Sequence, residues 1–277
     1  MKHPDIKELK KKAICIRKDI LRMLCEAGSG HTGGSLSSVE IMISLYHYKL
    51  RHDPKNPDWP ERDRFILSKG HACPALYAVL ADCGYFPKEE LMTLRKFGSR
   101  LQGHPHRGLP GIEISSGSLG QGLSISNGMA LSAVSAKLSS RIYCLMGDGE
   151  TNEGQVWEAA MTAAHYKLDN VCAIIDLNKL QIDGFCCDVK NTAPLDKKWG
   201  SFGWNVITVD GHDIEALMKA LDEAGSVKNK PSVLICCTVK GKGVSFIENK
   251  ADWHGIAPKK DELETAIKEL EEEKGKI

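Results

Sequence analysis

Residues 141–160, RIYCLMGDGETNEGQVWEAA, join a short apolar run to a helical stretch through a Gly-Asp-Gly turn. Every residue from 142 to 146 is apolar, which is typical of a strand buried on both faces of a sheet. Glycines at 147 and 149 allow a sharp turn and let a ligand approach the backbone closely. The stretch therefore predicts a strand, a turn and a helix, the unit that repeats in parallel α/β sheets.

The same alternation of short apolar runs and helical patterns extends over most of the chain. Further strands are predicted within 62–74, 171–176, 204–209 and 232–239. Helices are predicted at 5–27, 39–50, 75–84, about 120–138, 153–166 and 213–224. The fold class that follows is α/β, with a parallel β-sheet covered by helices on both faces.

The connecting segments carry signals of their own. Gly and Ser are abundant in residues 28–37, which predicts a loop, and Ser37 with Glu40 predicts a capping box that opens the next helix. Residues 98–117, rich in Gly, Pro and His, predict a long irregular stretch. In a compact domain such a stretch is usually functional or disordered.

Length and charge exclude some classes of partner. The chain has 277 residues, and 37 Lys and Arg against 36 Asp and Glu leave a net charge of +1. This balance argues against nucleic acid or an anionic membrane as a partner, and no apolar run approaches the roughly 18 residues of a membrane span. We expect one domain over 1–277, with an amino-terminal helix within 1–27 and a charged helix at 259–277.

The chain has ten cysteines but no Cys-x-x-Cys pair, which removes the main support for a zinc or dithiol site. Most of these cysteines lie in apolar runs, where a thiol behaves as a small hydrophobic group. The charged, amphipathic amino terminus lacks the apolar centre of a signal peptide. We therefore expect free thiols and a cytoplasmic location.

Asp148 is the polar residue at the end of the predicted strand 141–146, and Asn178 follows the next strand. Carboxyl ends of parallel strands share one edge of a sheet, where ligands bind. Gly-Asp-Gly alone is most often an ordinary turn, but a second oxygen donor at this edge favours a metal site. A helix amino terminus attracts phosphate, and a carboxylate beside a bound phosphate would repel it unless a cation lay between the two. We therefore predict Mg²⁺ bridging Asp148 to a diphosphate.

This pair and its spacing resemble the motif of thiamine-diphosphate-dependent enzymes, and nearly the whole chain resembles transketolase. The matching segments occur in the family's order: SGHTGG at 29–34, SKGHA at 68–72, GHP at 103–105, GSLGQGL at 117–123, GDGETNEG at 147–154, LNKLQIDG at 177–184, KGKGV at 240–244 and WHG at 253–255. One departure is Thr32, which stands where the family commonly has the proline of GHPG.

The resemblance implies the diphosphate-binding domain of the thiamine-diphosphate-binding fold, with thiamine diphosphate and Mg²⁺ (or Ca²⁺) as cofactors. It implies metal ligands from the side chains of Asp148 and Asn178 and from the carbonyl of Leu180. The cofactor-binding positions it implies are Lys69, His71, Gly117, Ser118, Leu119, Gly149, Glu153, Asn178, Ile182, Lys240 and His254. Glu153 also matches an acid that the family keeps at its subunit interface.

Four of the ten histidines lie in Gly-rich segments outside the predicted strands and helices: His31, His71, His104 and His254. Histidine can donate, accept or transfer a proton near neutral pH. By resemblance, His31, His104 and His254 contact the sugar and His71 spans cofactor and substrate, so these are the predicted catalytic residues. His106 is a weaker candidate. We expect His3, His47, His52 and His212 to be solvated.

The activity that the resemblance implies is transfer of a two-carbon ketol unit from a ketose phosphate to an aldose phosphate. The resemblance covers only the family's first domain. The glutamate that assists cofactor activation and the arginines that bind sugar phosphate lie on later domains of the family. We therefore expect the N-terminal subunit of a split transketolase, inactive without a C-terminal subunit that carries the pyrimidine-binding domain, and a heterotetramer of two plus two. The apolar face of residues 117–134 is a candidate part of the interface, with a buried core helix as the alternative.

Two other functions stay open. The diphosphate-binding subunit of a 2-oxoacid dehydrogenase shares the Gly-Asp-Gly turn and the later asparagine, although SGHTGG, SKGHA and WHG favour sugar chemistry. A non-catalytic half that only binds a partner is the other alternative, and the intact set of metal and histidine residues argues against it.

Overall fold

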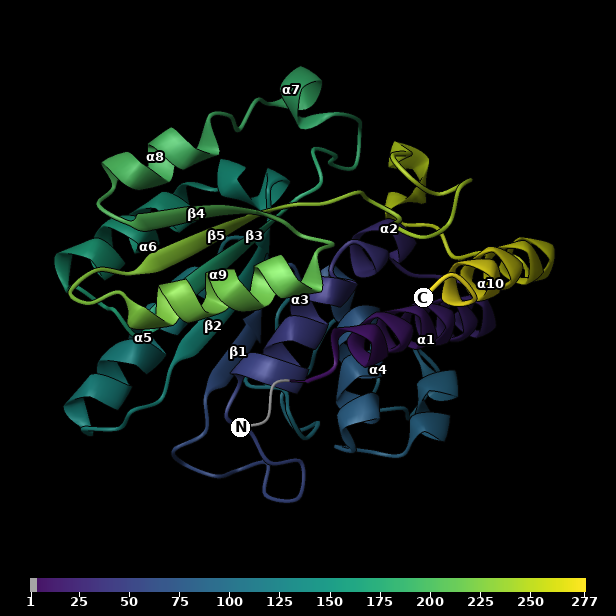
Figure 1. Ribbon diagram of the computed structural model, residues 1–277, viewed down its shortest axis with the longest axis horizontal. Helices are drawn as coiled ribbons and strands as arrows, with labels where there is room; N and C mark the ends of the chain where they lie inside the picture. Colours follow the sequence, from purple (N-terminus) through teal and green to yellow (C-terminus); the bar gives the residue numbers. More distant parts are fainter. Residues whose placement is uncertain (1–3) are drawn as a thin grey trace.

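One sheet of five parallel strands forms the centre of the computed structural model, which describes residues 4–277 (Figure 1). The strands pair in the order β1-β2-β3-β5-β4. Their bounds are Arg64–Leu67 for β1, Ile142–Gly147 for β2, Val171–Leu177 for β3, Asn205–Asp210 for β4 and Ser232–Cys237 for β5. Each lies at a predicted strand, and the predicted parallel sheet is confirmed.

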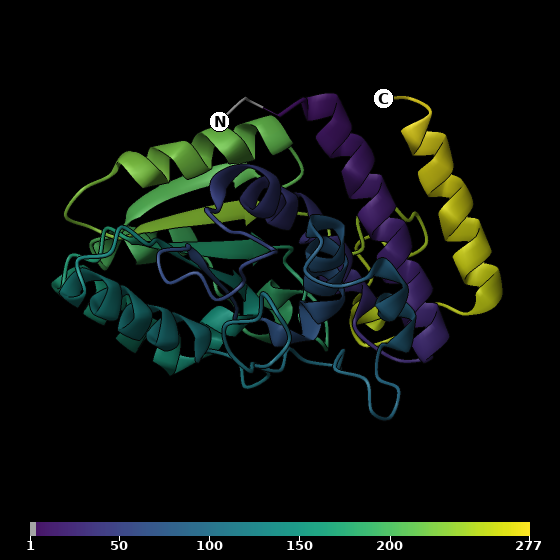
Figure 2. The same ribbon diagram turned by 90° about the horizontal axis from the view of Figure 1, so that it is seen from below.

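Helices cover both faces of the sheet, as the apolar strands predict (Figure 2). Side chains of β2 alternate between two hydrophobic cores: Tyr143 and Leu145 lie in one, and Cys144 and Met146 in the other. The first core is completed by α1 (Ile6–Ala27), α3 (Val39–Ser44), α4 (Cys73–Cys83) and α9 (Ile214–Ser226). The second is completed by α5 (Gly122–Ser135), α6 (Gly154–His165) and α8 (Leu195–Ser201).

The last helix of the described chain, α10 (Lys260–Lys274), packs beside α1 (Figure 2). An ion pair between Lys18 and Glu271 joins the two helices. Irregular backbone is confirmed for 98–117, which holds no helix or strand. The helix predicted at 39–50 ends as α3 at Ser44 and continues as a π-helical turn.

Two predictions at the start of the chain are wrong. The loop predicted at 28–37 contains a short buried helix, α2 (Thr32–Leu36). The capping box is absent as well, because neither side chain bonds the helix backbone as a cap. Ser37 donates to Asp176 of β3 at 2.6 Å, and Glu40 pairs with Arg17 at 2.7 Å. Partners distant in the sequence therefore override the local capping signal.

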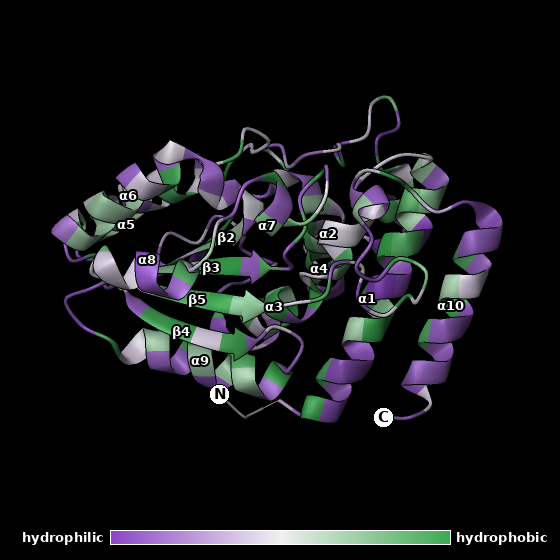
Figure 3. Cartoon of the chain, turned by 90° about the horizontal axis from the view of Figure 1, so that it is seen from above, coloured by the Kyte–Doolittle hydropathy of each residue, from purple (hydrophilic) through white to green (hydrophobic). Residues whose placement is uncertain are grey.

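Because all strands are parallel, their carboxyl ends meet at one edge of the sheet, and the segments that follow β1, β2, β3 and β5 lie there. The short helix α7 (Cys186–Val189) follows β3 on this side. Apolar residues gather in the strands and polar residues on the outer faces of the helices (Figure 3). None of the described helices is long and apolar enough to cross a membrane. All ten cysteines are free thiols.

Candidate active site

The carboxylate of Asp148, directly after β2, lies against the turn that follows β3. Its Oδ2 accepts a hydrogen bond from the backbone N–H of Lys179 at 2.8 Å, and its Oδ1 accepts from Gly149 at 3.0 Å. Lys179 stands between Asn178 and Leu180 and has a φ of 64°, in the left-handed region that non-glycine residues rarely adopt. Asp148 is therefore hydrogen-bonded to the sharply bent turn that carries the other two predicted metal ligands, Asn178 and Leu180.

The environment of Asp148 suits a cation. Asp148 is buried, and burial together with the negative charge of Asp176 raises the pKa of Asp148 to about 6. A buried carboxylate beside another is stabilised by a positive partner. Carboxylate, amide and carbonyl oxygens are the donors that Mg²⁺ prefers. Within residues 4–277, no three His, Cys, Asp or Glu side chains are grouped so that they could hold a metal. Of the three predicted metal ligands, only Asp148 is a residue of these types.

Asp176, which the sequence analysis did not single out, orients Asn178. Its carboxylate forms a buried ion pair with Lys69 and accepts a hydrogen bond from the Asn178 amide nitrogen at 3.1 Å. The amide oxygen of Asn178 is thereby directed away from Asp176. Lys69 also donates to the Gly34 carbonyl at 3.0 Å and to the Ser38 hydroxyl at 3.1 Å. All three of its N–H donors are thus used within the protein.

Lys240, three residues after β5, is a buried cation whose hydrogen-bond partners are uncharged. Its side chain is 1% exposed. The Nζ atom lies 2.9 Å from Nδ1 of His254 and 3.5 Å from the carbonyl oxygen of Gln181. No carboxylate of the described residues lies within ion-pair distance of it. Burial and the charge of Lys69 lower the pKa of Lys240 to about 8. A cation in this state fits an anionic ligand group such as a diphosphate.

The four predicted catalytic histidines form one cluster. The ring centroid of His31 lies 5.2 Å from that of His71, 6.1 Å from His104 and 5.4 Å from His254. His71 and His254 are 5.2 Å apart. They come from four separate segments: the start of α2, the turn after β1, the irregular 98–117 segment and the chain after β5.

Burial lowers the pKa of every histidine in this cluster, and nearby cations lower it further. The pKa falls to about 4 for His31 and to about 3 for His254, and it is lowered for His71 and His104 as well. All four rings are therefore neutral at pH 7, so each can accept at one nitrogen and donate at the other. Nδ1 of His31 is buried and has no partner among the described residues, which leaves it available to a ligand.

The other predicted cofactor positions border these groups. Gly117 lies against the histidine cluster, since a Cβ there would be 3.4 Å from Cδ2 of His104. Ser118 lines a hollow of about 400 Å³ at the start of α5, and Leu119 follows it in the same turn. Ile182 is 67% exposed beside the Asn178 turn. Glu153 is exposed at the amino terminus of α6 and lies against Gly120, where an added Cβ would be 2.7 Å from the Cβ of Glu153.

Glu150 is a second buried carboxylate that the sequence analysis missed. It accepts hydrogen bonds from the backbone N–H of Gly147 at 3.1 Å and of Gly120 at 2.8 Å, and from the hydroxyl of Ser68. It therefore ties the Gly-Asp-Gly turn to the segments after β1 and before α5. The signal for it was a second acidic residue directly after the Gly-Asp-Gly turn.

The prediction that His47, His52 and His212 are solvated is wrong, because each is partly buried and hydrogen-bonded within the protein. His212 lies 2.9 Å from Glu40 and accepts from a backbone N–H at 2.8 Å. His3 lies outside the described residues.

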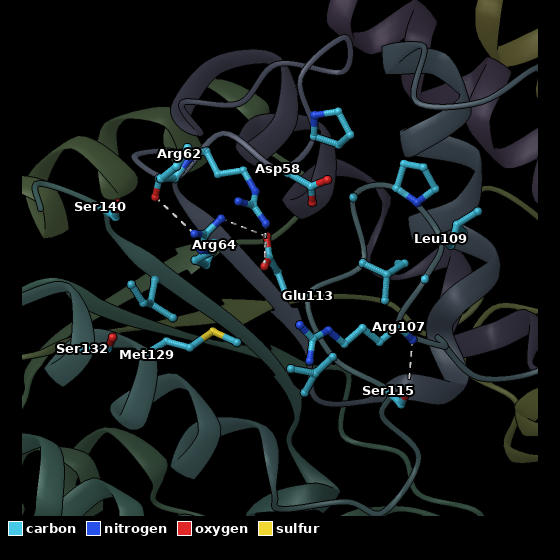
Figure 4. A pocket seen from close by; sticks show the side chains of 18 of the residues that line it. Asp58, Arg62, Arg64, Arg107, Leu109, Glu113, Ser115, Met129, Ser132 and Ser140 are labelled. Carbon is cyan, nitrogen blue, oxygen red and sulfur yellow. Dashed lines mark hydrogen bonds and ion pairs between the residues drawn. The ribbon is translucent and has the colours of Figure 1, made fainter. Parts of the chain in front are cut away.

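His106 lies apart from the histidine cluster and lines a cavity of about 1150 Å³. The cavity lies between the 106–115 segment, α5 and the first residues of β1 and β2 (Figure 4). Arg62 and Arg64 both reach Glu113 on its wall, at 3.0 and 3.8 Å (Figure 4). The start of each strand is opposite to the edge that holds Asp148, so this cavity is separate from the candidate active site.

Comparison with known proteins identifies the same domain. A family model described as "Transketolase, thiamine diphosphate binding domain" matches residues 10–274. The 6-deoxy-6-sulfo-D-fructose transketolase subunit of Clostridium sp. (strain MSTE9) is 45% identical over 96% of this chain and 97% of its own length. An apulose-4-phosphate transketolase subunit of Actinobacillus succinogenes is 47% identical over 96% of this chain and 97% of its own length.

Solved structures agree. The crystal structure of transketolase from Campylobacter jejuni superimposes with a TM-score of 0.91 at 34% identity, covering 98% of this chain. The match covers only 43% of the Campylobacter chain. The chain thus spans nearly the full length of the two subunits but less than half of that transketolase.

Proposed function

The chain belongs to the transketolase family, through its thiamine diphosphate binding domain, and we propose that it is the N-terminal subunit of a split transketolase. The complex moves a two-carbon ketol unit from a ketose phosphate to an aldose phosphate. One observation carries the proposal: Asp148 and the Asn178 turn, the unpaired Lys240 and the four-histidine cluster lie at one edge of the sheet. Full-length matches to two relatives named as transketolase subunits support the split arrangement.

The Asp148 end of the site holds the cofactor's diphosphate and its metal. Asp148, the Asn178 amide oxygen and the Leu180 carbonyl would bind a divalent cation, Mg²⁺ or Ca²⁺. Lys240 would neutralise charge on the diphosphate, and Gly149, which has no side chain, would let the diphosphate approach the turn closely. When bound, thiamine diphosphate supplies the electron sink for breaking and forming the carbon–carbon bond.

The histidine cluster handles the sugar. Because the rings are neutral at pH 7, each can donate a hydrogen bond to a sugar carbonyl oxygen or accept one from a hydroxyl. The buried Nδ1 of His31, which has no partner among the described residues, can hold or take a hydroxyl proton of the substrate. His104 lies at the outer side of the cluster, where its ring is exposed, and His71 lies between the sugar and Lys69.

The partner completes the site. We propose that the chain forms one diphosphate-binding domain, and that the partner supplies the pyrimidine-binding domain in a complex of two plus two chains. The exposed acid Glu153 and the neighbouring apolar face of α5 support an interface at this side. The ten free thiols support a reducing compartment, the cytoplasm.

Product analysis tests the function. The chain alone and the complex purified with its partner are given thiamine diphosphate, Mg²⁺, a ketose phosphate and an aldose phosphate. We expect a ketose phosphate longer by two carbons than the aldose only from the complex, and none when a 2-oxoacid replaces the ketose. Decarboxylation of a 2-oxoacid without ketol transfer would instead identify the dehydrogenase-type subunit.

A further inference from the structure

Arg95 joins the two loops that carry His31 and His104. Its Nη1 donates to the hydroxyl of Ser29, two residues before His31, at 3.2 Å. A Cβ added to Gly103, one residue before His104, would lie 2.6 Å from Nη2 of Arg95 and 2.7 Å from its Cζ. The guanidinium therefore packs directly against the Gly103 backbone, and a single side chain spans both loops.

The backbone of Arg95 is held in an uncommon conformation. Its φ is 60°, in the left-handed region, which costs a non-glycine residue energy and is retained only where surrounding contacts impose it. Its N–H donates to the carbonyl of Leu101 at 2.8 Å, which closes the loop back on the segment leading to His104. This conformation directs the side chain from its own loop toward Ser29.

The charge of Arg95 faces the histidines and is not neutralised by a carboxylate. Within the described part of the chain, no Asp or Glu lies at ion-pair distance from Arg95. After burial, the charge of Arg95 is what lowers the pKa of His104. For His31 it acts together with His104 and Lys240. Arg95 is partly buried, and its guanidinium contacts Ser29 and the Gly103 backbone instead of an acid.

We propose that Arg95 is a positioning residue for the substrate: by joining the loops before His31 and His104, it sets the spacing of these two imidazoles. The inference rests on the proposed function, because it takes both histidines as sugar contacts. The two rings are 6.1 Å apart and belong to segments that share no strand or helix, so a connection between the loops is what keeps them in register. A displacement of about 1 Å in a catalytic constellation can cost on the order of 10²-fold in rate.

The kinetic test uses two variants of the assembled complex that disturb the link in different ways. Arg95→Gln removes the guanidinium, whereas Gly103→Ala keeps it and displaces it with the added methyl group. We expect both to lower kcat/KM by roughly 10²-fold while the Kd of thiamine diphosphate with Mg²⁺ stays within about twofold. The matched control is Arg100→Gln, whose guanidinium pairs with Glu90 at 2.6 Å on the same segment and which should change neither quantity. Wild-type kcat/KM in both test variants, or loss of cofactor affinity in parallel with turnover, would overturn the inference.

A second readout does not depend on activity. Histidine side-chain NMR titration of the full chain should show the pKa of His104 rising in Arg95→Gln, because a cation that disfavours the imidazolium has been removed. The pKa of His31 should rise less, since Lys240, His71 and His254 still face it. An unchanged pKa of His104 in Arg95→Gln would count against the inference. Absence of ketol transfer by the wild-type complex would reject only the proposed function, and the titration would still test the inference.

Discussion

Lys69 and Asp176 form an ion pair in which the two side chains are 1% and 0% exposed. The pair joins the turn after β1 to the end of β3. It also links both to α2, because Lys69 donates to the Gly34 carbonyl and the Ser37 hydroxyl donates to Asp176. The segment after His31 is thus held by hydrogen bonds to this ion pair as well as by the apolar packing of Leu36.

Breaking this pair should lower the free energy of unfolding. In Lys69→Met the charge of Asp176 stays buried without its cation, a change that typically costs about 3–5 kcal/mol. The free energy of unfolding, measured by urea denaturation, should fall by that amount. Lys219→Met is the control, because Lys219 forms an exposed pair with Glu215 at 2.8 Å and should cost about 0–1 kcal/mol. Equal losses in the two variants would show that the buried pair does not hold the edge of the sheet.

Asp148→Asn should abolish the contribution of Mg²⁺ to cofactor binding. Asparagine has the size of aspartate and can still accept from the Lys179 N–H, although it gives up the hydrogen bond from the Gly149 N–H, so the link to the turn after β3 is kept while the negative charge is lost. Calorimetric titration of thiamine diphosphate into the complex, with and without Mg²⁺, measures the effect, and Asn178→Ala should behave in the same way. Asp183→Asn, an exposed acid on the same loop, should bind normally. Undiminished Mg²⁺-dependent affinity in Asp148→Asn would exclude the metal assignment.

The histidine cluster should divide into two classes. His31→Ala and His104→Ala should lower turnover by roughly 10²–10⁴-fold, as is typical of a lost acid, base or positioning group, with little change in cofactor affinity. His71→Ala should lower both, because His71 lies next to Lys69 and Lys240. Steady-state kinetics and cofactor titration on the same preparations make the comparison. The division is wrong if all three variants lose the cofactor equally.

The sheet could be predicted from the sequence because its signals are local. Short continuous apolar runs bounded by turn residues, such as 142–146, are typical of buried strands, and the carboxyl ends of parallel strands meet at one edge. Asp148 and Asn178 could therefore be placed together before any geometry was known. Only the family resemblance predicted that the four histidines share one site, because nothing in their spacing along the chain indicates that they meet in space.

The errors share a physical cause, which is that long-range polar contacts override local signals. Ser37 and Glu40 have the sequence of a capping box, but Asp176 and Arg17 bind them instead. His212 was expected in solvent for want of a visible partner, and that partner is Glu40, far away in the sequence. Asp176 itself ends a buried apolar run, and a carboxylate there must be paired. That rule could have identified it.

The pH dependence of stability should show the buried Glu40. Burial alone would raise its pKa, but the charge of Arg17 and the hydrogen bonds from His212 and Arg17 outweigh burial and lower it from 4.5 to about 2. The stability that this carboxylate contributes is therefore fully present above pH 4.5 and is lost as the pH falls through about 2. Urea unfolding of the wild type between these values should show the loss, and Glu40→Gln should remove that part of the slope. Glu8→Gln, an exposed acid of α1, is the control and should leave it unchanged.

The face formed by α5 and α6 should bind the partner subunit. Leu131 and Val134 of α5 are 36% and 59% exposed, and Met161 of the adjoining α6 is 54% exposed. The sequence allowed α5 to be either a core helix or part of an interface, and the structure buries only one side of it. A group of exposed apolar side chains is typical of an interaction surface. Leu131→Asp and Val134→Asp should leave the chain folded but prevent assembly, as measured by its mass in solution with the partner present. Ketol transfer should be lost together with assembly.

Phe97→Asp is the control, because it removes an even more exposed apolar side chain from a different segment and should assemble normally. If Leu131→Asp and Val134→Asp assembled and transferred ketol units like the wild type, the partner would have to bind elsewhere. Ketol transfer by the isolated wild-type chain would contradict the split enzyme altogether.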